Sequence, residues 1–427
     1  MPGRRRILWR SPGFCSPALF PAARIPPQGS MTPDFRCALD PILERAVAAR
    51  PGVPGVVAMV TDRGGSLYEG AAGRRRIDRP EAMTADTVFA FYSTTKAFTA
   101  TAALRLMEEG CLDPDAPAAR YAPQIGELPV IEGFAPGGDP ILRPPKRPIT
   151  VRMLLTHTAG FGYEFFNPVY ARLHRARGQP ASVTGRKASL LTPHLFDPGE
   201  RWEYGTSMDW CGQVIERVAG RRLGEVFRTE LFAPLGIESS GFSLTPSLRA
   251  RLAALHKRAP DGSLQPTDFA LPADPEVEMG GHGLYGTVGD FLRLIRMWLN
   301  DGMGDRGRVL RPATVRTAEQ SRIGPGNIPP FPGAGSRRPR LAEHLPGPSK
   351  SWGLGFLIDG EDLSTGRPAV SLSWVGLANT FFWIDRRNGI GGYWATQVLP
   401  FGDAAASGGY LDFESAVYAA RGKGRNG

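Results

Sequence analysis

The chain has 427 residues, of which 42% are hydrophobic and 22% are charged, a composition typical of a folded globular protein with a large core. Its formal net charge of +10 comes mainly from the two ends of the chain. Residues 1–30 carry five arginines and no acidic residue, and residues 421–427 carry three basic residues, which leaves +2 for the rest. Because a nucleic-acid-binding protein carries its basic excess on a folded face, we expect no nucleic-acid partner.

The sequence also indicates neither a membrane-spanning segment nor a metal-binding site. The sequence has no run of 18 apolar residues, so we expect no membrane span. The four cysteines have no paired spacing of the zinc-binding kind, and we expect neither a metal nor a cofactor. Near the N-terminus, three arginines and a short apolar stretch resemble an export signal, but Arg10 and Pro12 interrupt it. We therefore predict a cytoplasmic location, with residues 1–34 as a disordered tail or an extension from a misplaced gene start.

In chain order, the pattern predicts a helix at 41–49 and then a hairpin of two strands, 56–60 and 66–73, around an Asp-Arg-Gly-Gly turn. From about residue 110 to 290 the pattern is mainly helical, with long Pro-rich and Gly-rich connections. Residues 323–350 form a long loop rich in Pro, Gly and Arg, and loops of this length are usually functional or disordered. Further strands are predicted at 352–358, 369–375, 380–384 and 391–398, followed by a helix at 410–420.

Two blocks of strands thus bracket a helical middle. The economical arrangement is an α+β fold in which an antiparallel five-stranded sheet joins the N-terminal hairpin to the C-terminal strands, with helices on the sheet and an inserted all-helical lobe. We predict one domain at 35–420, with an α/β part at about 35–92 and 300–420, a helical lobe at about 93–299, and a basic tail at 421–427.

Ser93 and Lys96 stand at the start of an apolar helical pattern, where the sheet part gives way to the helical part. Side chains three residues apart lie on one side of a helix, with Cβ atoms about 5–6 Å apart, so the hydroxyl and the amine can meet. A serine hydroxyl becomes a good nucleophile when a neighbouring base takes its proton, and a buried lysine can be that base whereas an arginine cannot. Only six of the 51 basic residues are lysines, and this is the only Ser-x-x-Lys in the chain. The alternative interpretation is a polar helix start, with Ser93 as N-cap and Lys96 on a solvated face.

Four further segments complete a pattern with Ser93-Thr94-Thr95-Lys96. With them, the chain resembles the serine β-lactamase and penicillin-binding-protein superfamily, and most closely the class C β-lactamase-like branch that includes the family VIII esterases. The resemblance covers roughly residues 35–420, with the segments at compatible spacing. They are Leu154-Leu155-Thr156-His157-Thr158-Ala159-Gly160, Pro198-Gly199-Glu200-Arg201-Trp202-Glu203-Tyr204, Gly280-Gly281-His282-Gly283-Leu284-Tyr285-Gly286-Thr287 and Trp374-Val375-Gly376.

This resemblance implies a β-lactamase/transpeptidase-like fold and a role for each matched residue. Ser93 would be the nucleophile that forms an acyl-enzyme, and Lys96 the base that takes its proton. Tyr204 would share protons with Lys96 and the leaving group. Gly376 falls at the glycine of the third motif, and the N–H of Leu377 would pair with that of Ser93 as an oxyanion hole. We also expect the phenol and the amine to push each other's pKa toward neutrality.

Two positions depart from the family pattern. Trp374 stands where β-lactamases and carboxypeptidases commonly have a lysine that helps to bind a substrate carboxylate, and Thr206 stands at the usual asparagine of the second motif. An indole offers one N–H donor and a large apolar face. Both changes favour neutral, apolar esters over β-lactams or D-Ala-D-Ala peptides. Trp202, Tyr163, Phe161 and Phe165 could line an acyl pocket or could be core residues.

The sequence therefore predicts a serine hydrolase that acts on small-molecule carboxylic esters. Alternatives are an acyltransferase, a β-lactamase or D-aminopeptidase-type amidase acting on an amide, and a catalytically idle scaffold on the same fold. His157 is expected to be structural, although it could be a triad histidine, and His282 could touch the substrate. The absence of a Gly-x-Ser-x-Gly motif argues against an α/β-hydrolase. The sequence does not indicate an oligomeric state.

Overall fold

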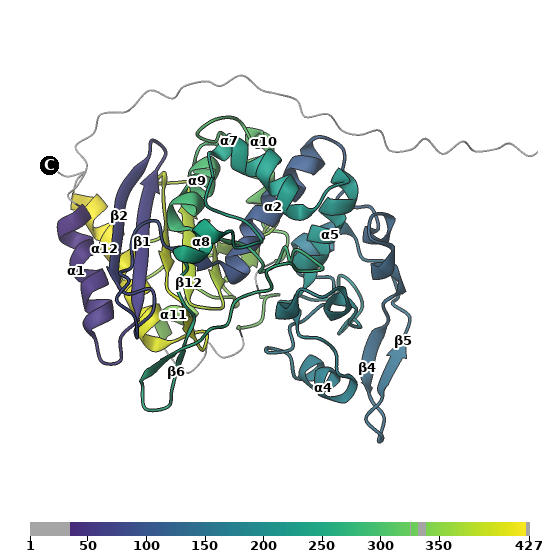
Figure 1. Ribbon diagram of the computed structural model, residues 1–427. Helices are drawn as coiled ribbons and strands as arrows, with labels where there is room; N and C mark the ends of the chain where they lie inside the picture. The colour runs from purple at the N-terminus through teal and green to yellow at the C-terminus, as the bar shows by residue number, and fades with distance from the viewer. Residues whose placement is uncertain (1–34, 325, 332–338, 424–427) are drawn as a thin grey trace, which may run out of the picture.

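The computed structural model describes residues 35–324, 326–331 and 339–423, and Figure 1 shows how their helices and strands are arranged. The tail predicted at 1–34 and the last four residues of the basic tail lie outside these ranges. The main element is a seven-stranded antiparallel sheet in the order β2-β1-β13-β12-β11-β10-β9. In that order its strands are Ser66–Gly73, Gly55–Asp62, Ile390–Ala395, Thr380–Asp385, Leu372–Gly376, Leu357–Asp359 and Lys350–Trp352.

The N-terminal hairpin joins the C-terminal strands, as the sequence predicts, because β1 pairs with β13 from Val57 opposite Ala395 to Asp62 opposite Ile390. The predicted count of five strands is wrong. All six strand segments predicted from the sequence join the sheet, and the one at 352–358 folds back on itself, so that β9 and β10 pair with each other. Gly355, with φ +98°, allows this turn, and a Cβ there would lie 2.2 Å from the Cβ of Ala100.

Helices cover both faces of the sheet. Neighbouring residues of one strand point to opposite faces, so a strand in the middle of three layers is apolar throughout. In β12, Phe381 stacks on Tyr410 of α12 at 4.4 Å between ring centroids, whereas the next residue, Phe382, packs on Phe291 of α9 at 4.9 Å. The helix α1 lies beside α12 (Figure 1). These helices are α1 (Phe35–Ala48), α9 (Val288–Leu299) and α12 (Ala404–Lys423).

The chain between β2 and α9 forms mostly short helices and small sheets, which lie mainly to the right of the main sheet in Figure 1. The helices are α2 (Lys96–Glu108), α3 (Val151–Leu155), α4 (Pro168–Arg177), α5 (Ser207–Ala219), α6 (Leu223–Val226), α7 (Ala233–Leu235) and α8 (Pro246–Ala250). The small strands are β3 (Val88–Ala90), β4 (Val130–Phe134), β5 (Pro140–Arg143), β6 (His256–Arg258), β7 (Leu264–Pro266) and β8 (Tyr285–Thr287), with β14 (Val398–Leu399) beside β6. Two further short helices, α10 (Pro312–Ala318) and α11 (Pro339–Ala342), precede β9.

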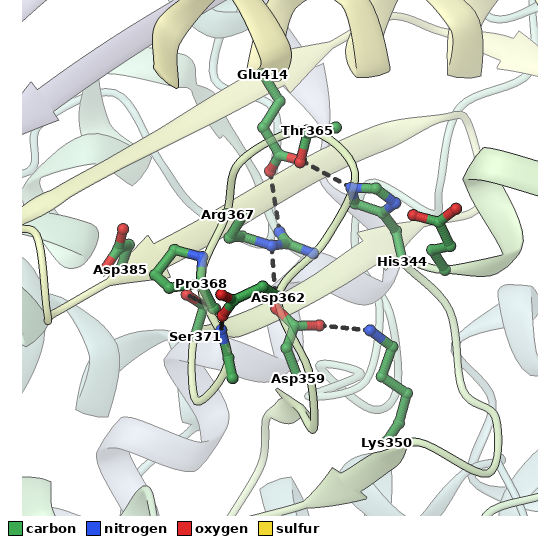
Figure 2. Close-up of polar contacts among 12 residues, drawn as sticks. His344, Lys350, Asp359, Asp362, Thr365, Arg367, Pro368, Ser371, Asp385 and Glu414 are labelled. Atoms are coloured by element: carbon green, nitrogen blue, oxygen red, sulfur yellow. Dashed lines mark hydrogen bonds and ion pairs between the residues drawn. The ribbon is translucent and has the colours of Figure 1, made fainter. Parts of the chain in front are cut away.

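A buried network of charges, which we call the Arg367 network, ties α12 to the β9–β10 edge of the sheet (Figure 2). The guanidinium of Arg367 pairs with Asp359 at 3.0 Å and with Glu414 of α12 at 3.1 Å. Lys350 of β9 pairs with the same aspartate at 2.9 Å, and His344 contacts the glutamate at 2.7 Å. Because these charges are all buried, each depends on its partners for stabilisation.

Candidate active site

Ser93 lies in a single turn of 3₁₀-helix, Tyr92–Thr95, directly before α2. The preceding residue, Tyr92, has φ +46°, a left-handed conformation that costs a non-glycine residue about 1–3 kcal/mol. Thr94 anchors the turn, since its hydroxyl lies 2.9 Å from the carbonyl of Phe91 and 2.8 Å from the phenol of Tyr393 in β13. The turn is therefore fixed to the main sheet, and it holds the Ser93 side chain half-buried at the wall of a pocket.

The amine of Lys96 is buried beside Ser93. Its Nζ lies 3.3 Å from Ser93 Oγ, and it donates to the carbonyl of Gly281 at 2.8 Å and to the hydroxyl of Tyr163 at 3.1 Å. Burial lowers the pKa of Lys96 to about 7, although the negative charge of Asp209 acts in the opposite direction. The alternative that Lys96 lies on a solvated face is wrong, because its side chain is 1% exposed.

Tyr204, from a segment more than 100 residues later, reaches the same point. The Lys96 Nζ lies 4.6 Å from the centroid of its ring, and its phenol forms a hydrogen bond with Ser93. Burial raises the pKa of Tyr204, although hydrogen bonds with Ser93 and Trp374 act in the opposite direction. The expectation that the phenol and the amine push each other's pKa toward neutrality is therefore wrong: burial lowers the pKa of the amine, and the phenol stays protonated at neutral pH.

The end of β11 forms the other side of the site. Gly376 packs so closely on the turn before Ser93 that a Cβ would lie 2.7 Å from the carbonyl oxygen of Phe91. Leu377 follows, and both residues line the pocket together with Ser93 and Tyr204. Trp374 lies behind Tyr204 instead, with its indole N–H donated to the phenol at 3.1 Å. Thr206 is buried next to the start of α5, and it is not among the described residues that line the pocket.

The pocket in front of Ser93 has a largely aromatic wall, and the empty space in and before it, open solvent included, is about 400 Å³. None of the described residues that line it is Lys, Arg, Asp or Glu, and His282 is the one histidine among them. The aromatic residues of the wall are Tyr92, Tyr163, Phe165, Phe166, Tyr204, Phe331 and Phe401. Of the four aromatic residues suggested from the sequence, Tyr163 and Phe165 line the pocket, whereas Phe161 and Trp202 are buried outside it.

The sequence did not indicate Tyr163 as a partner of the Lys96 amine, nor Asp209 as a partner of Tyr163. Tyr163 accepts a hydrogen bond from the amine, and it lies 3.4 Å from Asp209 through its own hydroxyl. Asp209, which is fully buried, also accepts from the N–H of Gly281 at 2.7 Å. The one available signal was a charged residue in the apolar pattern of a helix start, five positions after Tyr204.

The two histidines of interest have different surroundings. The His157 ring is fully buried, with ring centroids 5.1 Å from both Tyr204 and Trp352, and burial lowers its pKa well below the ordinary value. It packs behind Tyr204 and does not line the pocket among the described residues. His282 does line the pocket, and its Nδ1 lies 3.4 Å from Asp209.

This arrangement has the parts needed for covalent catalysis. A hydroxyl, an amine that is partly neutral at pH 7 and a protonated phenol meet at the wall of an apolar pocket. No group of three or more His, Cys, Asp or Glu side chains in the described ranges could hold a metal ion. Within the same ranges, no helix has both the length and the apolar character needed to cross a bilayer.

Comparison with known proteins gives consistent results. A family model described as Beta-lactamase matches residues 43–416. The lovastatin esterase of Penicillium rubens is 35% identical over 373 residues, which cover 82% of this chain and 90% of that protein. The monacolin J acid methylbutanoyltransferase of Aspergillus terreus is 33% identical over 409 residues, which cover 90% of this chain and 98% of the relative.

Among solved structures, a mutant of simvastatin synthase (LovD) from Aspergillus terreus aligns with a TM-score of 0.80 and 30% identity. The alignment covers 92% of this chain and 98% of the synthase. A penicillin-binding-protein homologue from Caulobacter crescentus aligns with a TM-score of 0.64 at 21% identity, which shows the fold alone. The sheet, the helices around it and the motif around Ser93 therefore have one explanation: the chain belongs to the Beta-lactamase family.

Proposed function

We propose that the protein is a serine hydrolase that cleaves neutral carboxylic esters through an acyl-enzyme on Ser93. One observation carries the proposal: the buried amine of Lys96 lies 3.3 Å from Ser93 Oγ, and burial lowers its pKa to about 7. A base whose pKa lies near the working pH transfers protons most effectively. The names of two relatives, an esterase and an acyltransferase, support the same class of reaction.

In the proposed reaction, Ser93 Oγ attacks the ester carbonyl while its proton passes to the Lys96 amine. The N–H groups of Ser93 and Leu377 stabilise the oxyanion, with Gly376 permitting the close approach of β11. The bond to the alcohol oxygen then breaks, and that oxygen takes up the proton by way of the Tyr204 hydroxyl. Water, activated by the same amine, attacks the acyl-enzyme and releases the acid and free Ser93. Trp374 supports Tyr204 through its hydrogen bond, and the backbone carbonyl of Thr206 accepts the N–H groups of Asp209 and Trp210 at the start of α5.

The lining of the pocket favours a neutral, apolar acyl group. A β-lactam or a D-Ala-D-Ala peptide carries a carboxylate, and its desolvation in an aromatic pocket is costly without a cationic partner. No Lys or Arg is among the described residues that line the pocket, and the third-motif position, Trp374, has its N–H committed to Tyr204. A short or medium acyl chain requires no such partner and gains free energy from burial against the aromatic side chains.

The direct test compares p-nitrophenyl butyrate with nitrocefin on the purified protein. We expect the ester to be cleaved far faster, and the reverse order would refute the assignment. A fluorophosphonate probe should label Ser93, and the Lys96→Ala substitution should abolish labelling. Retained labelling in that variant would show that Lys96 is not the base. Absence of labelling in the unmodified protein would favour the idle scaffold.

Acyl transfer to an alcohol is the second candidate. The observation that favours it is the similarity to the methylbutanoyltransferase, which extends over 98% of that protein. Transfer uses the same acyl-enzyme, with an alcohol in place of water at the second step. Adding a graded series of short alcohols to the p-nitrophenyl butyrate reaction distinguishes the two. A transferase yields butyrate esters in preference to butyric acid, whereas a hydrolase continues to yield the acid.

A further inference from the structure

The buried carboxylate of Asp209 contacts both Tyr163 and Gly281, the two residues that accept hydrogen bonds from the Lys96 amine. It lies near the start of α5 and is fully buried. Oδ1 accepts the backbone N–H of Gly281 at 2.7 Å, and Oδ2 lies 3.4 Å from the hydroxyl of Tyr163. The carbonyl of Gly281 and the hydroxyl oxygen of Tyr163 are the two acceptors of Lys96 N–H groups.

The direction of these hydrogen bonds decides what the amine can do. A neutral lysine amine has two N–H groups and one lone pair. When Tyr163 donates its O–H to Asp209, the phenol oxygen is left to accept from Lys96. The bond from the Gly281 N–H to Asp209 fixes the glycine whose carbonyl accepts the second Lys96 N–H. The lone pair of the amine is then directed at the remaining neighbour, Ser93 Oγ, at 3.3 Å.

The Gly280-Gly281 segment has little freedom once Asp209 is in place. The Gly280 carbonyl accepts the hydroxyl of Thr99 in α2 at 2.6 Å. A Cβ on Gly281 would lie 2.6 Å from Asp209 Oδ2, so the carboxylate packs directly on the backbone there. The segment that carries one acceptor of the amine is therefore held from two sides, by α2 and by Asp209.

We propose that Asp209 is a positioning residue that orients the Lys96 amine toward Ser93 through Tyr163 and Gly281. The inference rests on the proposed function, because it assigns Asp209 to the same reaction. It also explains why a carboxylate occurs at an apolar helix start. A neutral side chain could fill the space there, but it would not accept both hydrogen bonds.

The test is the pH dependence of kcat/KM for p-nitrophenyl butyrate in the Asp209→Asn variant. Burial lowers the pKa of Lys96, and the charge of Asp209 raises it. The other groups that face the amine are Ser93, Tyr163, Tyr204, His157 and, beside Asp209, His282. Removing the carboxylate charge lets the amine lose its proton at lower pH. We therefore expect the acid limb, near pH 7 in the unmodified protein, to move to lower pH.

On the high-pH plateau we expect kcat to fall about tenfold to a hundredfold with little change in KM, because proton transfer from Ser93 is less well oriented. The shift of the limb reports the action of the carboxylate charge on the amine, and the fall of the plateau reports the lost orientation of the amine. An unmoved limb, or a plateau equal to that of the unmodified protein, would overturn the proposal. The matched control is Asp290→Asn, another buried aspartate with hydrogen bonds to Ser239 and Ser240, which should leave the limb unchanged.

If Asp209→Asn does not fold, Tyr163→Phe removes the hydroxyl that joins the carboxylate to the amine. We expect the plateau kcat to fall about tenfold at unchanged melting temperature, and a kcat equal to that of the unmodified protein would contradict the proposal. The rate of fluorophosphonate labelling separates this proposal from the proposed function. If the protein cleaves no ester but its labelling rate shows the same shift in Asp209→Asn, the ester assignment fails and the role of Asp209 stands. If the two proteins label identically at every pH, the role of Asp209 fails.

Discussion

The Trp374 side chain connects the main sheet to the Tyr204 phenol through a single hydrogen bond of 3.1 Å. Its indole ring also packs on Trp352, at 4.7 Å between centroids, so it is held firmly in the core. A donor aimed at the phenol oxygen limits the directions in which the Tyr204 O–H can point. The residue therefore acts on the reaction through Tyr204, from behind the pocket wall.

Replacing Trp374 with phenylalanine keeps an aromatic ring and removes the N–H donor. Because one neutral hydrogen bond contributes about 0.5–1.5 kcal/mol, we expect kcat for p-nitrophenyl butyrate to fall about twofold to tenfold with KM little changed. The matched control is Trp383→Phe in β12, since the Trp383 indole is buried and its N–H has no partner within the described part of the chain. If the two variants have the same kcat, the hydrogen bond to Tyr204 has no catalytic effect.

At the scale of single residues, local contacts could be predicted and long-range contacts could not. Ser93 and Lys96 are three positions apart at a helix start, so elementary helix geometry brings them together. Tyr204 was identified through the family resemblance, because no local rule relates it to residue 93. The contact of Tyr163 with the amine, and that of Asp209 with Tyr163 and Gly281, were not predicted, since they depend on how the segments at 160–165 and 280–282 pack against α5.

At the scale of elements, the close approach of β11 to the Ser93 turn depends on Gly376. A Cβ at this position would lie 2.1 Å from Thr380 Oγ1 and 2.7 Å from the carbonyl of Phe91. Both distances are shorter than any normal contact, so a side chain here would push β11 away from the turn. Leu377, which follows directly, would move with the strand.

The Gly376→Ala substitution should therefore impair the proposed oxyanion hole. The loss of one oxyanion donor typically costs about 10²–10³ in kcat, and we expect a fall of this order in the steady-state rate for p-nitrophenyl butyrate. The control is Gly133→Ala in strand β4, where a Cβ meets nothing within 4 Å. A Gly376→Ala protein with normal kcat would show that Leu377 does not need this approach.

Some of the strands and helices were predicted correctly from the sequence pattern, and others were not. The hairpin β1–β2 and the strands β11 to β13 were predicted because apolar runs and turn residues mark them clearly. The β9–β10 turn was missed because Trp352-Gly-Leu-Gly-Phe356 reads as a continuous apolar run, and only the packing of α2 against Gly355 shows where the chain reverses. The helix predicted at 410–420 begins earlier, at Ala404.

At the scale of the whole molecule, the Arg367 network joins segments from the last quarter of the chain into one buried unit (Figure 2). Burial alone would raise the pKa of Glu414, but the charges of Arg367 and His344 outweigh burial and lower it to about 2. The ionised glutamate therefore stabilises the folded state wherever the unfolded chain would already be ionised, above about pH 4.3. This contribution is lost as the pH falls from about 4.3 to about 2.

The Glu414→Gln substitution should lower the free energy of unfolding at pH 7 by about 3–5 kcal/mol, because it leaves Arg367 with one buried partner fewer. The variant should also lose part of the pH dependence between pH 4.3 and 2, as measured by urea unfolding at a series of pH values. Glu238→Gln is the control, since Glu238 pairs with Arg306 on the surface and exposed pairs contribute at most about 1 kcal/mol. Equal stabilities of the two variants at pH 7 would contradict this account of the network.

The pairing of β1 with β13 also has a consequence for biosynthesis. The two strands are separated by more than 320 residues, and β13 and β12 occupy the middle of the sheet. A ribosome adds about 5–20 residues per second, so the N-terminal hairpin lacks its neighbouring strand β13 for roughly 15–65 s during synthesis. During that interval the unpaired edge of β1 can pair with strands of other chains. We therefore expect the nascent chain to require a chaperone until its last strands have been synthesised.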